Sequence, residues 1–198
     1  AEGEFDLVGF SVGVVGADRV ISGERVSPGD LLVGLHSPGL RSNGYSLARR
    51  LYFDVAQRSL DDPAWAGASV TVADELLRPS VIYAPAILAT IDAVDVNAIA
   101  HITGGGIPGN LNRVLTPAVD AVVERSAWTP PPVFSELQRL GTVSDDEMAK
   151  VFNMGIGMIV VVPPADRDDA LRVLSDHGHR PAVIGEIVDG GSGSVILR

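Results

Sequence analysis

The sequence predicts an α+β, or mixed α/β, domain in which a mixed sheet is flanked by helices. Hydrophobic residues make up 46% of its 198 residues, which is enough for a sizeable core, while aromatic residues make up only 5%. The core must therefore consist mainly of Val, Ile, Leu and Ala. Apolar runs of strand length alternate along the chain with segments of helical spacing, and this alternation has no strict β-α-β period.

The predicted strands are short apolar runs, many rich in β-branched residues, that are bounded by turn-forming residues. The first run is loosened by Gly9 and Gly13, the second follows a Ser-Pro-Gly-Asp turn at 27–30, and a glycine-rich turn at 189–191 separates the last two. In chain order, the predicted strands span 5–15, 31–35, 98–102, 119–124, 157–162, 182–188 and 194–197.

The predicted helices are segments whose apolar residues recur every three or four positions or whose ends carry capping signals. Ser42 and Asn43 are candidate caps of the first helix, and Ser144 with Glu147 forms a capping-box pattern. Gly178 is expected to end the last helix. In chain order, the predicted helices span 45–55, 72–77, 85–94, 111–115, 133–140, 144–152 and 166–176.

The composition argues against several classes of protein. A formal net charge of −10 and a pI of about 4.7 disfavour nonspecific nucleic-acid binding, which needs a basic face. The absence of cysteine excludes disulfides and thiol chemistry. No apolar run is long enough to span a membrane, and no spacing of His, Asp and Glu resembles a zinc site. We therefore expect a soluble cytoplasmic protein without a transition metal.

The segment 98–110 is the most informative part of the chain. A strand-like run ends in His101, the triple glycine 104–106 follows, and Pro108 and Asn110 open a predicted helix. Glycine lets a backbone adopt positive φ and lets a ligand approach closely, and a helix start offers free N–H groups to an anion. A histidine at the rim of such a cradle can hold or transfer a proton.

Two other interpretations of this segment remain open. Gly104, Gly106 and Gly109 fit the pattern Gly-x-Gly-x-x-Gly, but the pattern lies mid-chain, and neither Asp120 nor Glu124 is placed to bind a ribose. The glycines can also form a tight turn without any ligand. His36, His177 and His179 have weaker cases, and the last two are expected to lie in solvent at a helix end.

Two further loops combine glycine with polar side chains. The segment 41–46 offers guanidinium, hydroxyl and amide donors to a phosphate or a sugar, although ordinary helix capping explains it equally well. In the segment 152–158, Asn153 is placed to line a site beside Gly155 and Gly157. A helix-to-strand turn packed by Phe152 and Met158 accounts for the same residues.

Taken together, the three loops resemble phosphoribosylformylglycinamidine cyclo-ligase, the aminoimidazole ribonucleotide synthetase of purine synthesis. Ser-Asn-Gly-Tyr-Ser-Leu at 42–47, His-Ile-Thr-Gly-Gly-Gly at 101–106 and Phe-Asn-Met-Gly-Ile-Gly-Met at 152–158 occur in that family's order and approximate spacing. Residues 2–10 also resemble the strand that closes the family's first domain. The resemblance covers essentially the whole chain but only the second part of the family's chain.

The resemblance implies two regions and an activity. Residues 1–20 would contain the final strand of an N-terminal ATP-binding domain, and residues 21–198 would form the C-terminal α/β domain. The family uses ATP to close the imidazole ring of formylglycinamidine ribonucleotide, with Mg²⁺ shielding the phosphates. The acidic Mg-ATP motif lies upstream of Ala1, so this chain alone is expected to be inactive. The resemblance also implies a homodimer, built largely through the upstream domain.

The resemblance places a set of polar residues and glycines at an inter-domain cleft. His101 is the candidate for a proton-transfer role. The candidate substrate- or phosphate-binding residues are Arg41, Ser42, Asn43, Thr103, Gly104, Gly105, Gly106, Asn110 and Asn153. The family commonly has histidine where this chain has Arg41, which argues against proton transfer at that position but keeps a fixed positive charge for phosphate.

Two alternative functions remain. One is another ATP-using member of the same superfamily, such as a small-molecule kinase or a hydrogenase-maturation protein. The other is a non-catalytic phosphate-binding or assembly module that works with a partner chain.

Overall fold

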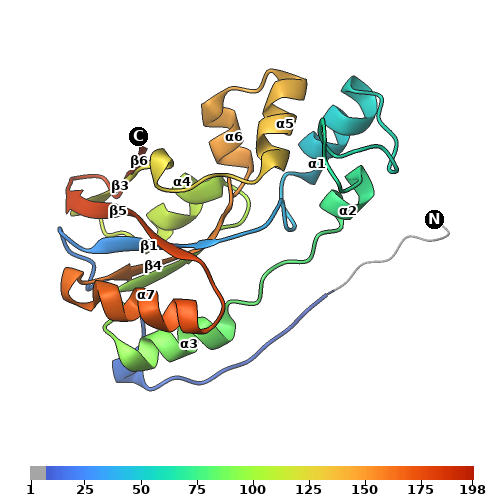
Figure 1. Cartoon of the computed structure of the whole chain (residues 1–198). Coiled ribbons are helices and arrows are strands. Elements are labelled where there is room, and N and C mark those ends of the chain that lie inside the picture. The colour runs from blue at the N-terminus through green and yellow to red at the C-terminus, as the bar shows by residue number, and fades with distance from the viewer. Residues whose placement is uncertain (1–7) are drawn as a thin grey trace.

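The computed structural model of the protein describes residues 8–198 (Figure 1). The strands of this part of the chain are β1 (Leu31–His36), β2 (Ala98–His101), β3 (Val119–Val123), β4 (Ile156–Val162), β5 (Pro181–Asp189) and β6 (Val195–Leu197). They form one sheet in the order β2-β4-β1-β5-β3-β6. Only β3 and β6 pair in parallel; the other neighbours are antiparallel, so the predicted mixed sheet is confirmed.

The helices also follow the predicted order. They are α1 (Tyr45–Arg49), α2 (Val72–Leu76), α3 (Ala84–Ala93), α4 (Gly106–Leu111), α5 (Pro132–Gly141), α6 (Asp145–Val151) and α7 (Arg167–Asp176). A π-helical segment, Arg50–Val55, continues α1, so the predicted helix 45–55 is confirmed with a wider last turn. None of the helices in residues 8–198 is long and apolar enough to cross a membrane.

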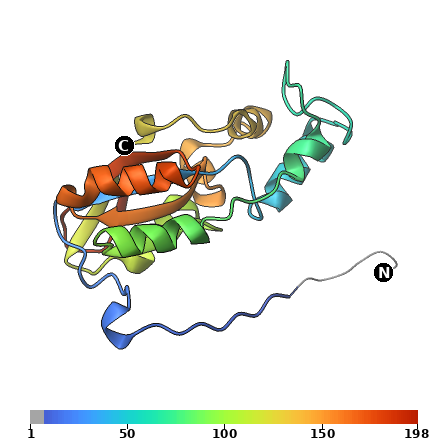
Figure 2. The same cartoon turned by 60° about the horizontal axis from the view of Figure 1, so that its bottom comes forward.

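Helices cover both faces of the sheet. Side chains alternate along β1, so Leu32 packs with Leu111 of α4 on one face, while Val33 packs with Ile87 of α3 and Leu174 of α7 on the other. Helices α3 and α7 lie side by side across that second face (Figure 2). The sheet is therefore the middle layer of the domain.

The remaining helices form a lobe beyond the end of β1 (Figure 1). Helices α1, α2, α5 and α6 share a separate apolar cluster that contains Tyr52, Phe134 and Phe152. The rings of Phe134 and Phe152 lie 5.7 Å apart in a tilted arrangement. Because α6 ends beside Phe152 and β4 begins at Ile156, this lobe determines how the chain enters the sheet.

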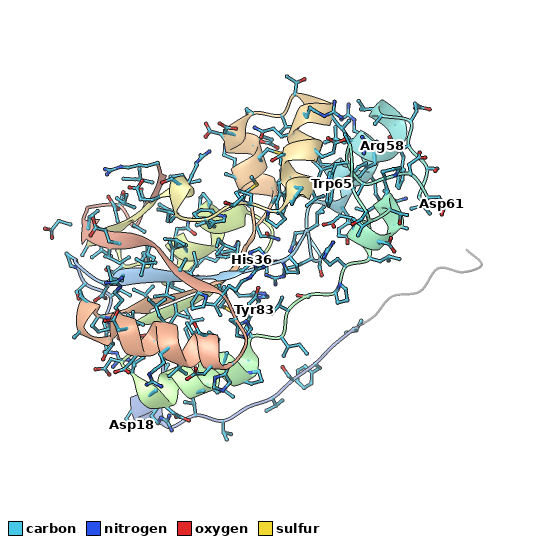
Figure 3. All side chains as sticks on the ribbon, viewed as in Figure 1. Asp18, His36, Arg58, Asp61, Trp65 and Tyr83 are labelled. Atoms are coloured by element: carbon cyan, nitrogen blue, oxygen red, sulfur yellow. The ribbon has the colours of Figure 1, made fainter. Side chains whose placement is uncertain are left out.

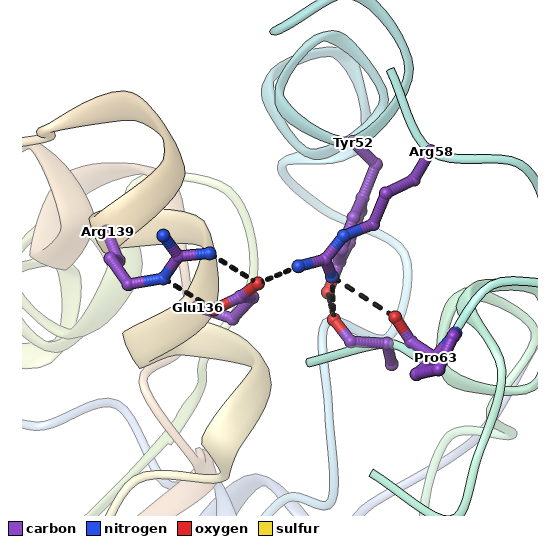
Figure 4. A network of polar contacts seen from close by, with 6 residues as sticks. Tyr52, Arg58, Pro63, Glu136 and Arg139 are labelled. Atoms are coloured by element: carbon purple, nitrogen blue, oxygen red, sulfur yellow. Dashed lines mark hydrogen bonds and ion pairs between the residues drawn. The ribbon is translucent and has the colours of Figure 1, made fainter. Parts of the chain in front are cut away.

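A buried carboxylate holds the lobe together (Figure 4). Glu136 of α5 is 6% exposed and accepts hydrogen bonds from Arg139 at 2.9 Å and a further one from Arg58. Arg58 also donates to the Ala64 carbonyl at 2.7 Å, and the Tyr52 hydroxyl donates to the same oxygen at 3.0 Å. The hydrogen bonds from Arg139, together with the one from Arg58, lower the pKa of Glu136.

Three expectations about local structure were wrong. In the described part of the predicted strand 5–15, residues 8–15 form no strand, because no described strand pairs with them, and Phe10 is 92% exposed. Residues 5–7 lie outside the described part of the chain. The helix predicted at 111–115 begins earlier, at Gly106, and ends in a 3-10 turn over Asn112–Val114.

The third correction concerns caps. Neither Ser42 nor Asn43 caps α1: its N-cap is Gly44, at a φ of 80°, and no side chain caps the helix. At α6, the Ser144 hydroxyl accepts from the Glu147 N–H at 3.3 Å, so the predicted serine cap is confirmed, but the described residues show no return bond from the Glu147 side chain to complete a capping box. Gly178 follows α7 at a φ of 81°, which confirms it as the helix-ending residue.

Replacing Glu136 with Gln is expected to destabilise the protein by roughly 3 kcal/mol, because two guanidinium groups lose their buried counter-charge. The loss should appear in urea unfolding at pH 7. Since the folded-state pKa of Glu136 is lowered, its contribution is present above about pH 4.5 and disappears as the pH falls through the folded-state pKa. The difference between wild type and Glu136→Gln should therefore shrink in acid; a difference independent of pH would contradict this account.

Candidate functional site

The three polar loops singled out by the sequence meet at one edge of the sheet. Strands β2 and β1 end there, at His101 and His36, while β4 and β5 begin there, at Ile156 and Pro181. The antiparallel order of β2, β4, β1 and β5 produces this arrangement, because it brings two strand ends and two strand starts to the same edge. Loops far apart in the sequence are thereby placed next to one another.

Arg41 joins these loops. Its backbone is left-handed, with a φ of 63°, and its Nη1 donates to the carbonyl oxygens of Ile102 at 3.2 Å and Gly157 at 3.0 Å. Its Nε donates to Ser80 Oγ at 3.2 Å, and its Nη2 contacts Nε2 of His101. One guanidinium group therefore connects the ends of β2 and β4 with the loop before α3.

The electrostatics of this pair favour an anion. Partial burial, followed by the nearby charge of Arg41, lowers the pKa of His101. Burial also lowers the pKa of Arg41. Within residues 8–198, no carboxylate lies within 4 Å of either side chain as an ion-pair partner. A cation without a counter-charge at a solvent-accessible edge suits a negatively charged ligand.

Packing within the protein requires glycine in the segment 104–106, independently of any ligand. Gly105 and Gly106 have φ values of 99° and 61°. A Cβ at Gly106 would overlap the Ala149 carbonyl of α6, so only glycine lets α4 pack this closely. Gly104 is exposed, and a Cβ there would meet only Asn43, with Oδ1 at 3.3 Å. The segments 41–46 and 101–106 are therefore direct neighbours, and Gly104 is open to a ligand.

The amides of Asn110 and Asn153 support the loops. Both residues are 4% exposed. Asn110 accepts from Thr103 Oγ1 at 2.9 Å and donates to the Gly106 carbonyl at 2.7 Å. Asn153 donates to the Gly39 carbonyl at 2.8 Å and accepts from the Gly155 N–H at 2.7 Å. These hydrogen bonds engage the Asn110 and Asn153 amides inside the protein. Ser42, by contrast, is exposed, and Asn43 and Thr103 are half-buried, so their side chains are more accessible to a ligand.

The structure adds residues that the sequence analysis missed. Tyr83, 4% exposed, lies beside the site: its hydroxyl donates to the His36 carbonyl at 2.8 Å, and Arg41 lies over its ring. The His179 ring stacks on the Tyr83 ring, with centroids 5.4 Å apart, so the expectation that His179 only lies in solvent was wrong. In the sequence, the signal that could have drawn attention to Tyr83 is that it is the one aromatic residue between Pro79 and Pro85.

The surface next to Arg41 and His101 is apolar. A shallow hollow there is lined by Ser80, Ile82, Tyr83 and Met158 among others. Ile82 is 79% exposed, and Leu77 and Leu88 nearby in the chain are also exposed. The candidate site thus has a cationic centre with an apolar flank.

Comparison with known proteins identifies the family. The model of a family described as "AIR synthase related protein, C-terminal domain" matches residues 27–198. The chain belongs to this family. The AIR synthase-related match includes all three loops and every strand of the sheet.

Two curated relatives that cover nearly the whole chain carry the same name. The phosphoribosylformylglycinamidine cyclo-ligase of Alkaliphilus oremlandii is 43% identical over 197 residues, which cover 100% of this chain and 57% of that protein. The protein of the same name from Myxococcus xanthus is 47% identical over 190 residues, which cover 96% of this chain and 55% of that protein. The chain therefore spans a little over half the length of these relatives.

Solved structures support the fold. Thiamine-monophosphate kinase from Stenotrophomonas maltophilia has a TM-score of 0.61 at 18% identity, over 92% of this chain and 54% of that one. The hydrogenase maturation protein HypE of E. coli has a TM-score of 0.54 at 20% identity, over 88% of this chain and 48% of that one. At these identities the likeness concerns the fold alone.

Substituting Gly157 with Ala is expected to destabilise the domain by about 1–3 kcal/mol. The new methyl group would overlap the Tyr83 hydroxyl and lie 2.8 Å from Arg41 Nη1. Urea unfolding measures the change. Gly109→Ala is the matched control, since no atom beyond its chain neighbours and the backbone of its own helix lies within 4 Å of a Cβ there. Equal stability of the two variants would show that the edge is not packed around Gly157.

Replacing Arg41 with Gln is expected to raise the pKa of His101 while leaving it below 6.5, because the neighbouring charge disappears and the partial burial remains. Histidine C–H resonances followed by NMR across pH 5–8 measure this pKa. Arg49→Gln, at the exposed end of α1, is the control and should leave it unchanged. A His101 pKa that stays constant or falls in Arg41→Gln would contradict the contact between the two side chains.

Proposed function

We propose that this chain is the C-terminal part of an ATP-dependent cyclo-ligase that converts formylglycinamidine ribonucleotide to aminoimidazole ribonucleotide, with release of ADP and phosphate. The observation that carries the proposal is the convergence of loops 41–46, 101–106 and 152–158 around Arg41 and His101. Relatives named for this reaction match the chain at 43–47% identity. Because the chain spans little more than half of them, the ATP-binding part belongs to the remainder of such a protein.

In this proposal, the site residues position the substrate and hold its charge. Arg41 supplies a fixed positive charge, and the accessible glycine backbone at 104–105 and the hydroxyls of Ser42 and Thr103 supply hydrogen bonds. Asn43 lies beside Gly104 and contributes a side-chain amide. Gly106, Asn110 and Asn153 keep the loops in place.

His101 is proposed to receive a proton during ring closure. ATP first phosphorylates the formyl-amide oxygen; an internal nitrogen then attacks the activated carbon, the carbon–oxygen bond breaks, and phosphate leaves. The attacking nitrogen must lose a proton. A histidine whose pKa is lowered is neutral at pH 7 and can accept it. The same lowered pKa extends the active range to a lower pH than an unperturbed histidine would allow.

The described residues do not fit a Mg²⁺ site. Within residues 8–198, no group of three or more His, Cys, Asp or Glu is placed to hold a metal ion, whereas Mg²⁺ prefers carboxylates and phosphate oxygens. In the proposal, ATP and Mg²⁺ are therefore held mostly by the remainder of the protein. A homodimer, which the resemblance implies, and a cytoplasmic location, which the composition led us to expect, complete the proposal, and its partner is a ribonucleotide rather than a nucleic acid.

The second candidate function is a non-catalytic phosphate-binding module. The observation that favours it is that the cationic centre is assembled from residues of this chain, while no metal-holding group is found among residues 8–198. Such a module would bind an anion and act only with a partner chain.

Joining this chain to the N-terminal part of the Myxococcus xanthus relative tests the proposal. We expect phosphate release from ATP that depends on formylglycinamidine ribonucleotide in the fusion and none from the 198-residue chain alone. No activity in a folded fusion would contradict the ligase assignment and favour the binding module.

In the same fusion, His101→Gln should lower kcat by about 100-fold, the usual contribution of a positioned base. His177→Gln, on the exposed end of α7, should leave kcat unchanged. Wild-type turnover in His101→Gln would remove His101 from the mechanism. A loss confined to KM would make it a binding group only.

A further inference from the structure

The segment between β1 and α1 carries the cationic centre of the candidate site. It spans 37–44 and contains Arg41, and it is neither helix nor strand. Figure 3 shows His36, where the segment begins, and Arg58 in the lobe to which it leads. Because the segment has no regular structure of its own, contacts with other parts of the chain must fix its path.

Helix α2 and the turn after it contact this segment at both ends and in the middle. At the far end, the Tyr45 hydroxyl donates to the Leu76 carbonyl. In the middle, Arg41 Nε donates to Ser80 Oγ at 3.2 Å. Near the start, Gly39 packs against the side chains of α2 and of the turn. One short stretch of the chain therefore holds the whole segment.

Glu75 supplies the contact at Gly39. The glutamate is 2% exposed, and its Oε2 accepts from Arg78 Nε at 3.1 Å and from Nη2 at 2.6 Å. A Cβ at Gly39 would lie 2.9 Å from Glu75 Oε1 and 3.4 Å from Arg78 Cδ, so the ion pair lies directly against the main chain there. From the loop 152–158, Asn153 donates to the Gly39 carbonyl at 2.8 Å. Gly39 is therefore held by α2 and by a second loop of the site.

Stability alone does not explain why Glu75 is buried here. Among residues 8–198, its Oε1 has no hydrogen-bond partner. A buried carboxylate oxygen without a partner costs free energy, and burial raises the pKa of Glu75. The ion pair with Arg78 joins positions three residues apart and would form equally well on an exposed helix surface. A role in placing Gly39 accounts for both the burial and the contact.

We propose that Glu75 is a positioning residue for Arg41: its side chain, held by Arg78, packs on Gly39 and thereby fixes the guanidinium group of Arg41 against His101. Arg41 lies two residues after Gly39 and has a left-handed backbone with a φ of 63°, so a displacement of Gly39 also displaces Arg41. The proposal rests on the proposed function for what Arg41 binds, but the positioning itself is independent of the ligand.

The pKa of His101 reports the position of Arg41. Burial and the charge of Arg41 lower this pKa, so it should rise when Arg41 moves away. Arg41 and Tyr83 are the other titratable groups that line the hollow beside His101. Losing the charge of Glu75 would by itself act in the opposite direction, because removing a negative charge lowers a histidine pKa. The sign of the change therefore separates positioning from a direct charge effect.

The experiment is a pH titration of the His101 C–H resonances by NMR in the 198-residue chain. Glu75→Ala is expected to raise the His101 pKa by most of the rise that Arg41→Gln produces. Glu75→Gln keeps the shape of the side chain and an oxygen for Arg78, so it should leave the His101 pKa near the wild-type value.

Glu136→Ala is the matched control. Glu136 is also a buried carboxylate, 6% exposed, and is also paired with an arginine three residues later, Arg139. Its removal should lower the urea midpoint as Glu75→Ala does, but it should leave the pKa of His101 unchanged. A purely structural role of Glu75 would make the two variants alike in both measurements.

Gly39→Ala tests the same contact without changing any charge. The new methyl group would lie 2.9 Å from Glu75 Oε1, and Glu75 is enclosed and bonded to Arg78, so the main chain must give way. The pKa of His101 should therefore rise in this variant as well. If Glu75→Ala does not fold, Gly39→Ala decides the question.

The proposal is overturned if the folded variants Glu75→Ala and Gly39→Ala keep the wild-type pKa of His101, if Glu136→Ala raises it equally, or if Glu75→Gln raises it as far as Glu75→Ala. In the fusion, Glu75→Ala should also move the acid limb of the kcat profile to higher pH, because His101 must be neutral to accept a proton. An inactive fusion would remove the ligase function only, since the NMR measurement needs no turnover.

Discussion

The guanidinium group of Arg41 is the contact on which the functional edge depends. It donates to two main-chain carbonyls that follow β2 and begin β4, and it also reaches Ser80 and His101. A lysine has one nitrogen and cannot serve these directions at once. Because the guanidinium group is already hydrogen-bonded to the backbone, its charge is fixed in space before any ligand arrives. Preorganised charge of this kind binds without a reorganisation cost.

Much of the fold could be predicted because its signals are local. The runs of β4 and β5 are long and rich in β-branched residues, β1 is a short apolar run, and Ser144 marks the start of α6 with its side chain. The meeting of the three loops was also accessible, through their resemblance to a family. The pairing partners of the strands could not be predicted from the sequence, since register depends on contacts between distant segments.

The errors have physical reasons. Glycine and proline disfavour helices, so a helix beginning at Gly106 is visible only once its packing against Ala149 is known. Residues 8–15 alternate as a strand should, yet a strand exists only when another strand pairs with it. Whether the Asn153 amide faces solvent or the backbone, and whether His179 meets Tyr83, depends on loops whose paths no local pattern encodes.

The antiparallel edge also connects binding with folding. Its groups come from segments near positions 41, 83, 101, 157 and 179, so no contiguous piece of the chain contains the site. The site exists only after the non-local pairings of β2, β4, β1 and β5 have formed, which are slow to close because their loops are long. A ligand at this edge therefore stabilises the entire sheet by mass action rather than a single loop. Slowed amide exchange deep in β4 would accompany occupancy at its end.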